Sequence, residues 1–100
     1  MVFCSGQIGL EPASGNLVGG GFGPQAEQAF KNLAAVALAS GGSLNQAVKL
    51  TLFLTDLSKF AQVNELMKQY FNEPYPARST IGVASLPKGA EFEVEAILML

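Results

Sequence analysis

The chain has 100 residues and a net charge of −2, and this length predicts one domain spanning residues 1–100. It has no histidine and only one cysteine, which excludes Ser-His-Asp triads, an internal disulfide and most zinc sites, so we expect no metal. The six Lys and Arg residues are scattered and form no basic run that could follow a phosphate backbone, so we expect no nucleic-acid partner.

The N-terminal region predicts a strand followed by a glycine-rich connector. Residues 2–8 alternate between two faces, which is the pattern of a strand. Cys4 lies in this apolar strand, where a small core residue is a simpler interpretation than a nucleophile, because no base is near it in the sequence. The glycines within residues 19–23 precede a helix and could cradle a phosphate, but no Lys-Ser or Lys-Thr follows them. A flexible connector is therefore the better interpretation.

The middle of the chain predicts two helices with a strand between them. Pro24 suits the first turn of a helix, and apolar residues then recur at steps of three and four until about residue 40. Residues 47–54 alternate as a strand, and residues 55–71 predict a second helix with Asn64 at the border of its apolar stripe. Taken alone, Asn64 is most simply interpreted as a satisfied polar residue at a helix–sheet edge.

The last quarter predicts two strands, which we interpret as a hairpin with its loop at residues 86–90. In the register that this loop sets, Val83 faces Glu93, whereas Arg78 lies about 16 Å further along its strand and points to the other face. One copy of the chain would then keep Arg78 and Glu93 apart. A site that uses both groups would have to be shared between subunits.

The element order strand, helix, strand, helix, strand, strand predicts an α+β fold in which both helices cover one face of a single mixed sheet. The other face of that sheet would be exposed in one copy. Charged residues make up only 14% of the chain, whereas about 25% is typical. Both observations predict that another copy covers part of this surface. No signal peptide or membrane-length apolar run is present, so we expect a cytoplasmic protein without a membrane partner.

Arg78 and Glu93 are the candidate catalytic residues. A guanidinium binds a carboxylate through two parallel hydrogen bonds, and a nearby carboxylate can orient and deprotonate a water. Together they suit the hydrolysis of a small organic acid. On residue types alone, the alternative is that Arg78 forms an ion pair with a glutamate across an interface, because ion pairs outnumber catalytic sites.

Motifs along essentially the whole chain resemble the RidA/YjgF family. In chain order they are Ser5-Gly6-Gln7-Ile8, Val63-Asn64-Glu65, Pro76-Ala77-Arg78-Ser79-Thr80, Leu86-Pro87-Lys88-Gly89-Ala90 and Phe92-Glu93-Val94-Glu95-Ala96-Ile97. The resemblance implies a chorismate-mutase-like fold and a homotrimer with a cleft at each subunit interface. It also implies hydrolysis, without a cofactor, of reactive 2-imino or enamine acids such as 2-iminopropanoate and 2-iminobutanoate to 2-keto acids and ammonia.

The resemblance implies roles for individual residues. Arg78 would bind the substrate carboxylate, and its presence is typical of members with deaminase activity. Glu93 would direct the water. The residues that line the cleft would be Ser5, Gly6, Asn64 and Thr80. Family members usually carry an N-terminal segment with an aromatic residue before the Ser-Gly-Gln strand, and this chain begins almost on that strand, so we expect this segment to be short.

The sequence also suggests two alternative functions. A non-enzymatic protein could bind small carboxylic acids in the same Arg78 cleft and act as a sensor or regulator. The family's other known role, as a translation inhibitor or ribonuclease, is disfavoured by the acidic balance of charge and by the missing basic patch.

Overall fold

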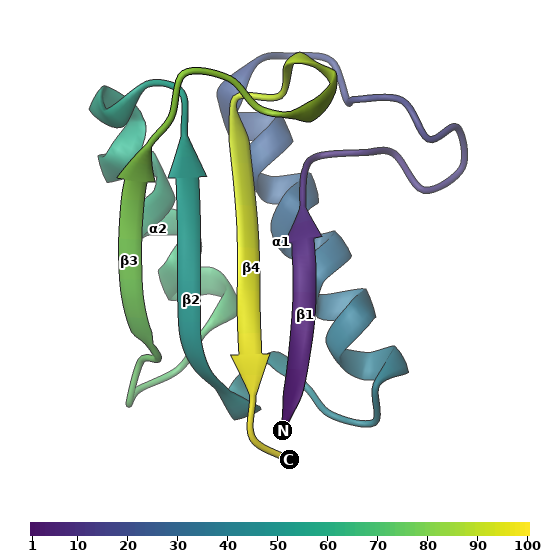
Figure 1. The fold of residues 1–100 in the computed structure, drawn as a ribbon, viewed down its shortest axis with the longest axis vertical. Helices are drawn as coiled ribbons and strands as arrows, with labels where there is room; N and C mark the ends of the chain where they lie inside the picture. The colour runs from purple at the N-terminus through teal and green to yellow at the C-terminus, as the bar shows by residue number, and fades with distance from the viewer.

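A four-stranded mixed sheet forms one layer and two helices form the other in the computed structural model, which describes residues 1–100 (Figure 1). The strands and helices follow the chain in the order β1 (Val2–Gln7), α1 (Phe22–Ala39), β2 (Ala47–Leu54), α2 (Phe60–Tyr70), β3 (Ala77–Gly82) and β4 (Phe92–Leu98). Both helices lie behind the sheet in the view of Figure 1. The predicted α+β fold, with two helices on one face of a mixed sheet, is therefore confirmed.

The buried face of helix α1 combines alanines with larger side chains. Ala26, Ala29 and Ala37 are fully buried beside Phe30 and Leu33. Small residues permit a short distance between the backbones, and the larger ones fill the space that remains. Beyond the helix, Gly41 adopts a φ of 92°, the left-handed conformation that commonly ends a helix.

The core lies between the helices and one face of the sheet. Leu50, Leu52 and Leu54 of β2 are fully buried, and they alternate with residues that point to the outer face. No element of this chain covers that outer face, on which Phe3 is 72% exposed and Ile81 is 43% exposed. Large apolar side chains left in water are costly, so an exposed apolar sheet face marks an interaction surface.

The predicted hairpin is wrong, because β2 lies between β3 and β4. The sheet order is β1-β4-β2-β3, with β3 parallel to β2 and β4 antiparallel to it. Two backbone hydrogen bonds tie the connection to the end of β2: Val83 donates to Leu54 and Thr55 donates to Glu91. The segment after β3 therefore passes over the end of β2 (Figure 1) instead of turning back beside its own strand.

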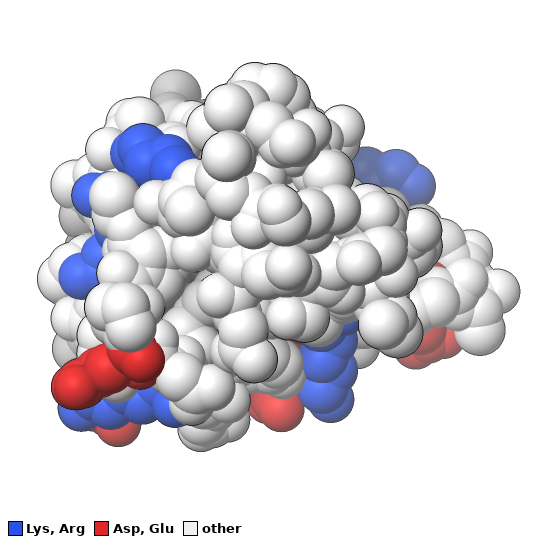
Figure 2. Space-filling model, turned by 90° about the horizontal axis from the view of Figure 1, so that it is seen from below, with Lys and Arg blue, Asp and Glu red and all other residues white.

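Figure 2 shows the end of the molecule at which both chain termini lie. Uncharged atoms fill the middle of this view, and the Lys, Arg, Asp and Glu side chains lie around its rim. The cations are scattered on this face and do not gather into one patch. Neither helix is both long and apolar enough to cross a membrane.

Candidate active site

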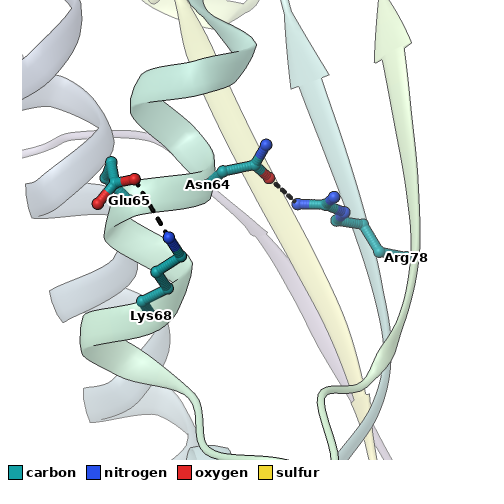
Figure 3. Close-up of polar contacts among 4 residues, drawn as sticks. All are labelled: Asn64, Glu65, Lys68 and Arg78. Carbon is teal, nitrogen blue, oxygen red and sulfur yellow. Dashed lines mark hydrogen bonds and ion pairs between the residues drawn. The ribbon is translucent and has the colours of Figure 1, made fainter.

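Arg78 lies on the edge strand β3 and points to the helix side of the sheet, because it pairs with Leu50, a core residue of β2. Its Nη1 donates a hydrogen bond of 2.6 Å to Oδ1 of Asn64 (Figure 3). Its guanidinium carbon lies 4.9 Å from the centre of the Phe60 ring, within the range of a cation–π contact. Since both partners belong to α2, this helix sets the position of the guanidinium.

A hollow of about 540 Å³ lies beside this arginine. Its lining mixes polar and apolar side chains: Ala61, Asn64, Glu65, Met67, Lys68, Tyr75, Pro76 and Arg78. The other cation of the hollow, Lys68, is paired with Glu65 at 3.3 Å (Figure 3). Neither of the two ion pairs in the chain includes Arg78. Arg78 is therefore the cation of this hollow that has no carboxylate partner within the chain.

Thr80 lies on the same side of β3 as Arg78. It is two residues further along the strand and pairs with the buried Leu52, so its side chain also faces the helix side. The structure thus brings Asn64 and Arg78 together where the edge of the sheet meets α2, and places Thr80 on the same side of the sheet but outside the lining of the hollow. We call these three residues the arginine half-site.

Ser5, Gly6 and Glu93 come together on the outer face of the sheet. A β-bulge between Cys4 and Gln7 interrupts the pairing of β1 with β4 at this point. A Cβ atom added to Gly6 would lie 2.7 Å from Oε2 of Glu93, closer than any ordinary contact. Only glycine therefore fits beside the carboxylate in its present position. We call these three residues the glutamate half-site.

The environment of Glu93 changes its acidity. Partial burial of the carboxyl group raises its pKa, and the neighbouring carboxylate of Glu95 raises the pKa further. A carboxylate with a raised pKa is a stronger base than an ordinary glutamate. Cys4 behaves differently: burial raises the pKa of its thiol and so disfavours the thiolate, in agreement with the prediction of a core residue.

Gln25 of α1 forms hydrogen bonds with Glu91, the residue just before β4. It is the only buried polar side chain, at 5% exposure. Its Oε1 accepts a 2.9 Å hydrogen bond from the backbone N–H of Glu91, and its Nε2 donates to Oε2 of the same residue at 3.4 Å. Glu91 is two residues before Glu93, so this contact fixes the backbone that carries the glutamate half-site.

The two half-sites lie on opposite faces of the sheet in one copy of the chain. Arg78 pairs with the buried Leu50 and faces the helices, whereas Glu93 pairs with Phe53 on the outer face. One copy therefore keeps the guanidinium and the carboxylate apart, as we expected. The predicted hairpin register is not the reason, however. The two residues are apart because β2 lies between β3, which carries Arg78, and β4, which carries Glu93.

Sequence reasoning missed two features of these half-sites. Phe60 falls within the apolar stripe predicted for residues 55–71, which gives no indication of a contact with Arg78, although its spacing of four residues from Asn64 predicts a common face. The regular alternation assigned to residues 2–8 gave no indication of the bulge. The glycine in Ser5-Gly6 was the available signal, because glycine within a strand often marks a bulge or a close approach.

Comparison with known families agrees with this fold and with the motifs. The family model described as Endoribonuclease L-PSP matches residues 1–100. The solved structures that are similar to this chain include a RidA protein. The chain therefore belongs to this family, whose members are the RidA/YjgF proteins that the motifs resemble.

Individual relatives are similar over nearly the whole chain. The 2-iminobutanoate/2-iminopropanoate deaminase of Homo sapiens is 46% identical over 96 residues, which are 96% of this chain and 70% of that protein. The protein of the same name from Dermatophagoides farinae is 42% identical over 99 residues, 99% of this chain and 77% of the relative. The crystal structure of RidA from an Antarctic Psychrobacter bacterium superposes with a TM-score of 0.94 at 49% identity, covering 98% of this chain and 79% of the other.

Proposed function

We propose that this protein is a deaminase that hydrolyses reactive 2-imino and enamine acids, such as 2-iminopropanoate and 2-iminobutanoate, to 2-keto acids and ammonia. Relatives that are 42% and 47% identical carry the name of this activity. The structural observation that supports it most directly is Arg78, which a helix holds beside a hollow without a carboxylate partner. The proposed substrates all carry a carboxylate next to the imine carbon.

Arg78 binds this carboxylate in the proposed mechanism. A planar guanidinium and a carboxylate form two parallel hydrogen bonds, which fix the orientation of the acid as well as its position. Asn64 accepts a hydrogen bond from Nη1 and leaves other N–H groups of the guanidinium for the substrate. Thr80 lies two residues along the same strand and lines the cleft next to the bound acid.

Glu93 of a second copy acts on the water. The carboxylate removes a proton from a water molecule as its oxygen adds to the imine carbon. The imine nitrogen is protonated when the water adds, and Glu93 then returns the water's proton to the nitrogen of the tetrahedral adduct. The C–N bond breaks and ammonia leaves, while the adduct hydroxyl gives its proton to Glu93 and becomes the C=O of the 2-keto acid. The raised pKa of Glu93 suits both steps, because the group must accept a proton and give it back. Glu93 carries each of these proton transfers, so the reaction as proposed uses no cofactor.

A homotrimer is the assembly that we propose for this chemistry. Packing the outer sheet face of one copy against the β3 edge of the next would bring a glutamate half-site to an arginine half-site. The uncovered apolar side chains of that face, Phe3 and Ile81 among them, support such packing. Ser5 and Gly6 would then line the cleft from the glutamate side, where the missing side chain of Gly6 leaves room for the carboxylate of Glu93.

A second candidate is a protein that binds small carboxylic acids without hydrolysing them. The arginine half-site favours it, because Arg78, Asn64 and the hollow are already assembled within one copy. The name of the family model also raises the question of ribonuclease activity. The net charge of −2 and the scattered cations argue against a nucleic-acid partner.

The experiment generates 2-iminopropanoate in situ with an amino-acid oxidase acting on alanine, and measures the loss of imine by competition with semicarbazide. We expect the wild-type protein to accelerate the loss and Arg78→Ala to abolish the effect, whereas Lys31→Ala, which removes a cation from the exposed face of α1, leaves it intact. No acceleration by the wild-type protein would contradict the deaminase. Retained binding of 2-oxobutanoate in that case would support the second candidate.

A further inference from the structure

Phe60 has an unusual environment for a phenylalanine. It is only partly buried at the first position of α2, and it belongs neither to the core cluster nor to the partly buried apolar residues packed against that cluster. It forms no pair with another aromatic ring. Its notable contact is the guanidinium of Arg78, 4.9 Å from the ring centre. Packing of the core therefore does not account for an aromatic ring at this position.

Phe60 and Asn64 hold the guanidinium from two directions. They are four residues apart on α2 and so lie on the same face of the helix. The guanidinium carbon of Arg78 lies over the ring of Phe60, and Oδ1 of Asn64 accepts a hydrogen bond from Nη1 at 2.6 Å. A contact at the central carbon and a hydrogen bond at one nitrogen together restrict the orientations that the guanidinium can take.

We propose that Phe60 is a positioning residue, which orients Arg78 so that the edge formed by Nε and Nη2 binds the carboxylate of the substrate. Arg78 makes no other side-chain hydrogen bond within the chain, so the N–H groups of Nε and Nη2 are free. These two N–H groups are parallel and match the spacing of a carboxylate. The identity of the ligand as an imino or keto acid rests on the proposed deaminase, whereas the role of the ring in orienting the guanidinium does not.

The expected size of the effect follows from the exposure of the site. Arg78 is an exposed side chain with many rotamers, so its fork must be ordered before it can accept a ligand through two bonds. The free energy of a cation–π contact at an exposed position corresponds to about a three- to fivefold change in a dissociation constant. Loss of the ring should weaken carboxylate binding by about that factor and leave the steps after binding unchanged.

The test compares Phe60→Leu, which keeps an apolar side chain, with Phe60→Tyr, which keeps the ring. Binding of 2-oxobutanoate, a stable keto acid, is measured by NMR titration or calorimetry, together with KM, kcat and the melting temperature. We expect Phe60→Leu to raise Kd and KM about three- to fivefold with kcat nearly unchanged, and Phe60→Tyr to bind like the wild type. Equal melting temperatures would separate this role from a purely structural one.

Three results would overturn the proposal. These are wild-type affinity in Phe60→Leu, equally weak binding in both variants, or no binding of 2-oxobutanoate by the wild-type protein. Should Phe60→Leu fold poorly, Phe60→Met takes its place as a flexible apolar side chain without a ring. A wild-type protein that binds the keto acid with this dependence on the ring, but does not hydrolyse imines, would remove the deaminase and leave the role of Phe60 in place.

Discussion

Gly6→Ala should reduce the rate of catalysis while leaving the fold intact. The added Cβ would lie 2.7 Å from Oε2 and 2.8 Å from Cδ of Glu93, whereas ordinary contacts begin at about 3.4 Å. The carboxylate must therefore move by about 0.7 Å, the difference between the ordinary contact and the 2.7 Å approach. A displacement of about 1 Å at a reacting group can lower a rate about 100-fold, so we expect kcat to fall about 10- to 100-fold.

The assay is the imine-loss measurement with the Gly6→Ala variant. The clash involves the end of a side chain that can rotate away, so we expect the melting temperature to change little. Gly19→Ala is the matched control, because a Cβ at Gly19 has no atom within 4 Å. A Gly6→Ala protein with wild-type kcat would refute the reasoning, because Glu93 would then act equally well from a displaced position.

Four further predictions concern the residues around the two half-sites. Arg78→Lys keeps the charge but loses the planar fork, so we expect kcat/KM to fall about 10- to 100-fold in steady-state kinetics, and an unchanged value would exclude bidentate binding. Gln25→Leu leaves the partly buried backbone N–H of Glu91 without its acceptor, so we expect a loss of about 1 kcal/mol in the free energy of unfolding by urea; an unchanged midpoint would contradict this. The raised pKa of Glu93 predicts that the wild-type rate falls on acidification at a pH above the usual range of a glutamate; a pH–rate profile that stays flat down to that range would contradict this. The same raised pKa means that the folded chain binds more protons than the unfolded chain between the unfolded and folded pKa values of Glu93. Its contribution to stability therefore falls as pH rises through that window, and Glu93→Gln should unfold at a higher urea concentration at neutral pH than the wild type.

The helices and the buried face of the sheet were predictable because local patterns determine them. The alanines of α1 recur at helical spacing, and the leucines of β2 alternate. The partners of the strands were not predictable in the same way. The turn residues Pro87 and Gly89 indicate that the chain changes direction, but they do not say which strand it joins next. The pairing of β3 with β2 depends on contacts between distant parts of the sequence.

The candidate site was predictable in its residue types and not in its geometry. The motifs that contain Arg78, Asn64 and Glu93 indicate the residue types of the candidate site, and their roles stay predictions. Periodicity could not place Asn64 beside Arg78, which is 14 residues away in sequence. The contact of Phe60 with Arg78 could not be predicted for a further reason. An aromatic ring in a helical stripe usually packs into the core, and only the structure shows this ring beneath a guanidinium.

The central claim is that each active site uses Arg78 from one copy and Glu93 from its neighbour. Arg78→Ala and Glu93→Gln should each be inactive alone, so the direct test is to unfold the two variants, mix them in equal amounts, refold them together and measure imine hydrolysis. Random assembly places an intact arginine opposite an intact glutamate at about one site in four, so we expect about a quarter of the wild-type activity. A mixture as inactive as its two components would contradict the account, because both residues would then have to come from the same copy.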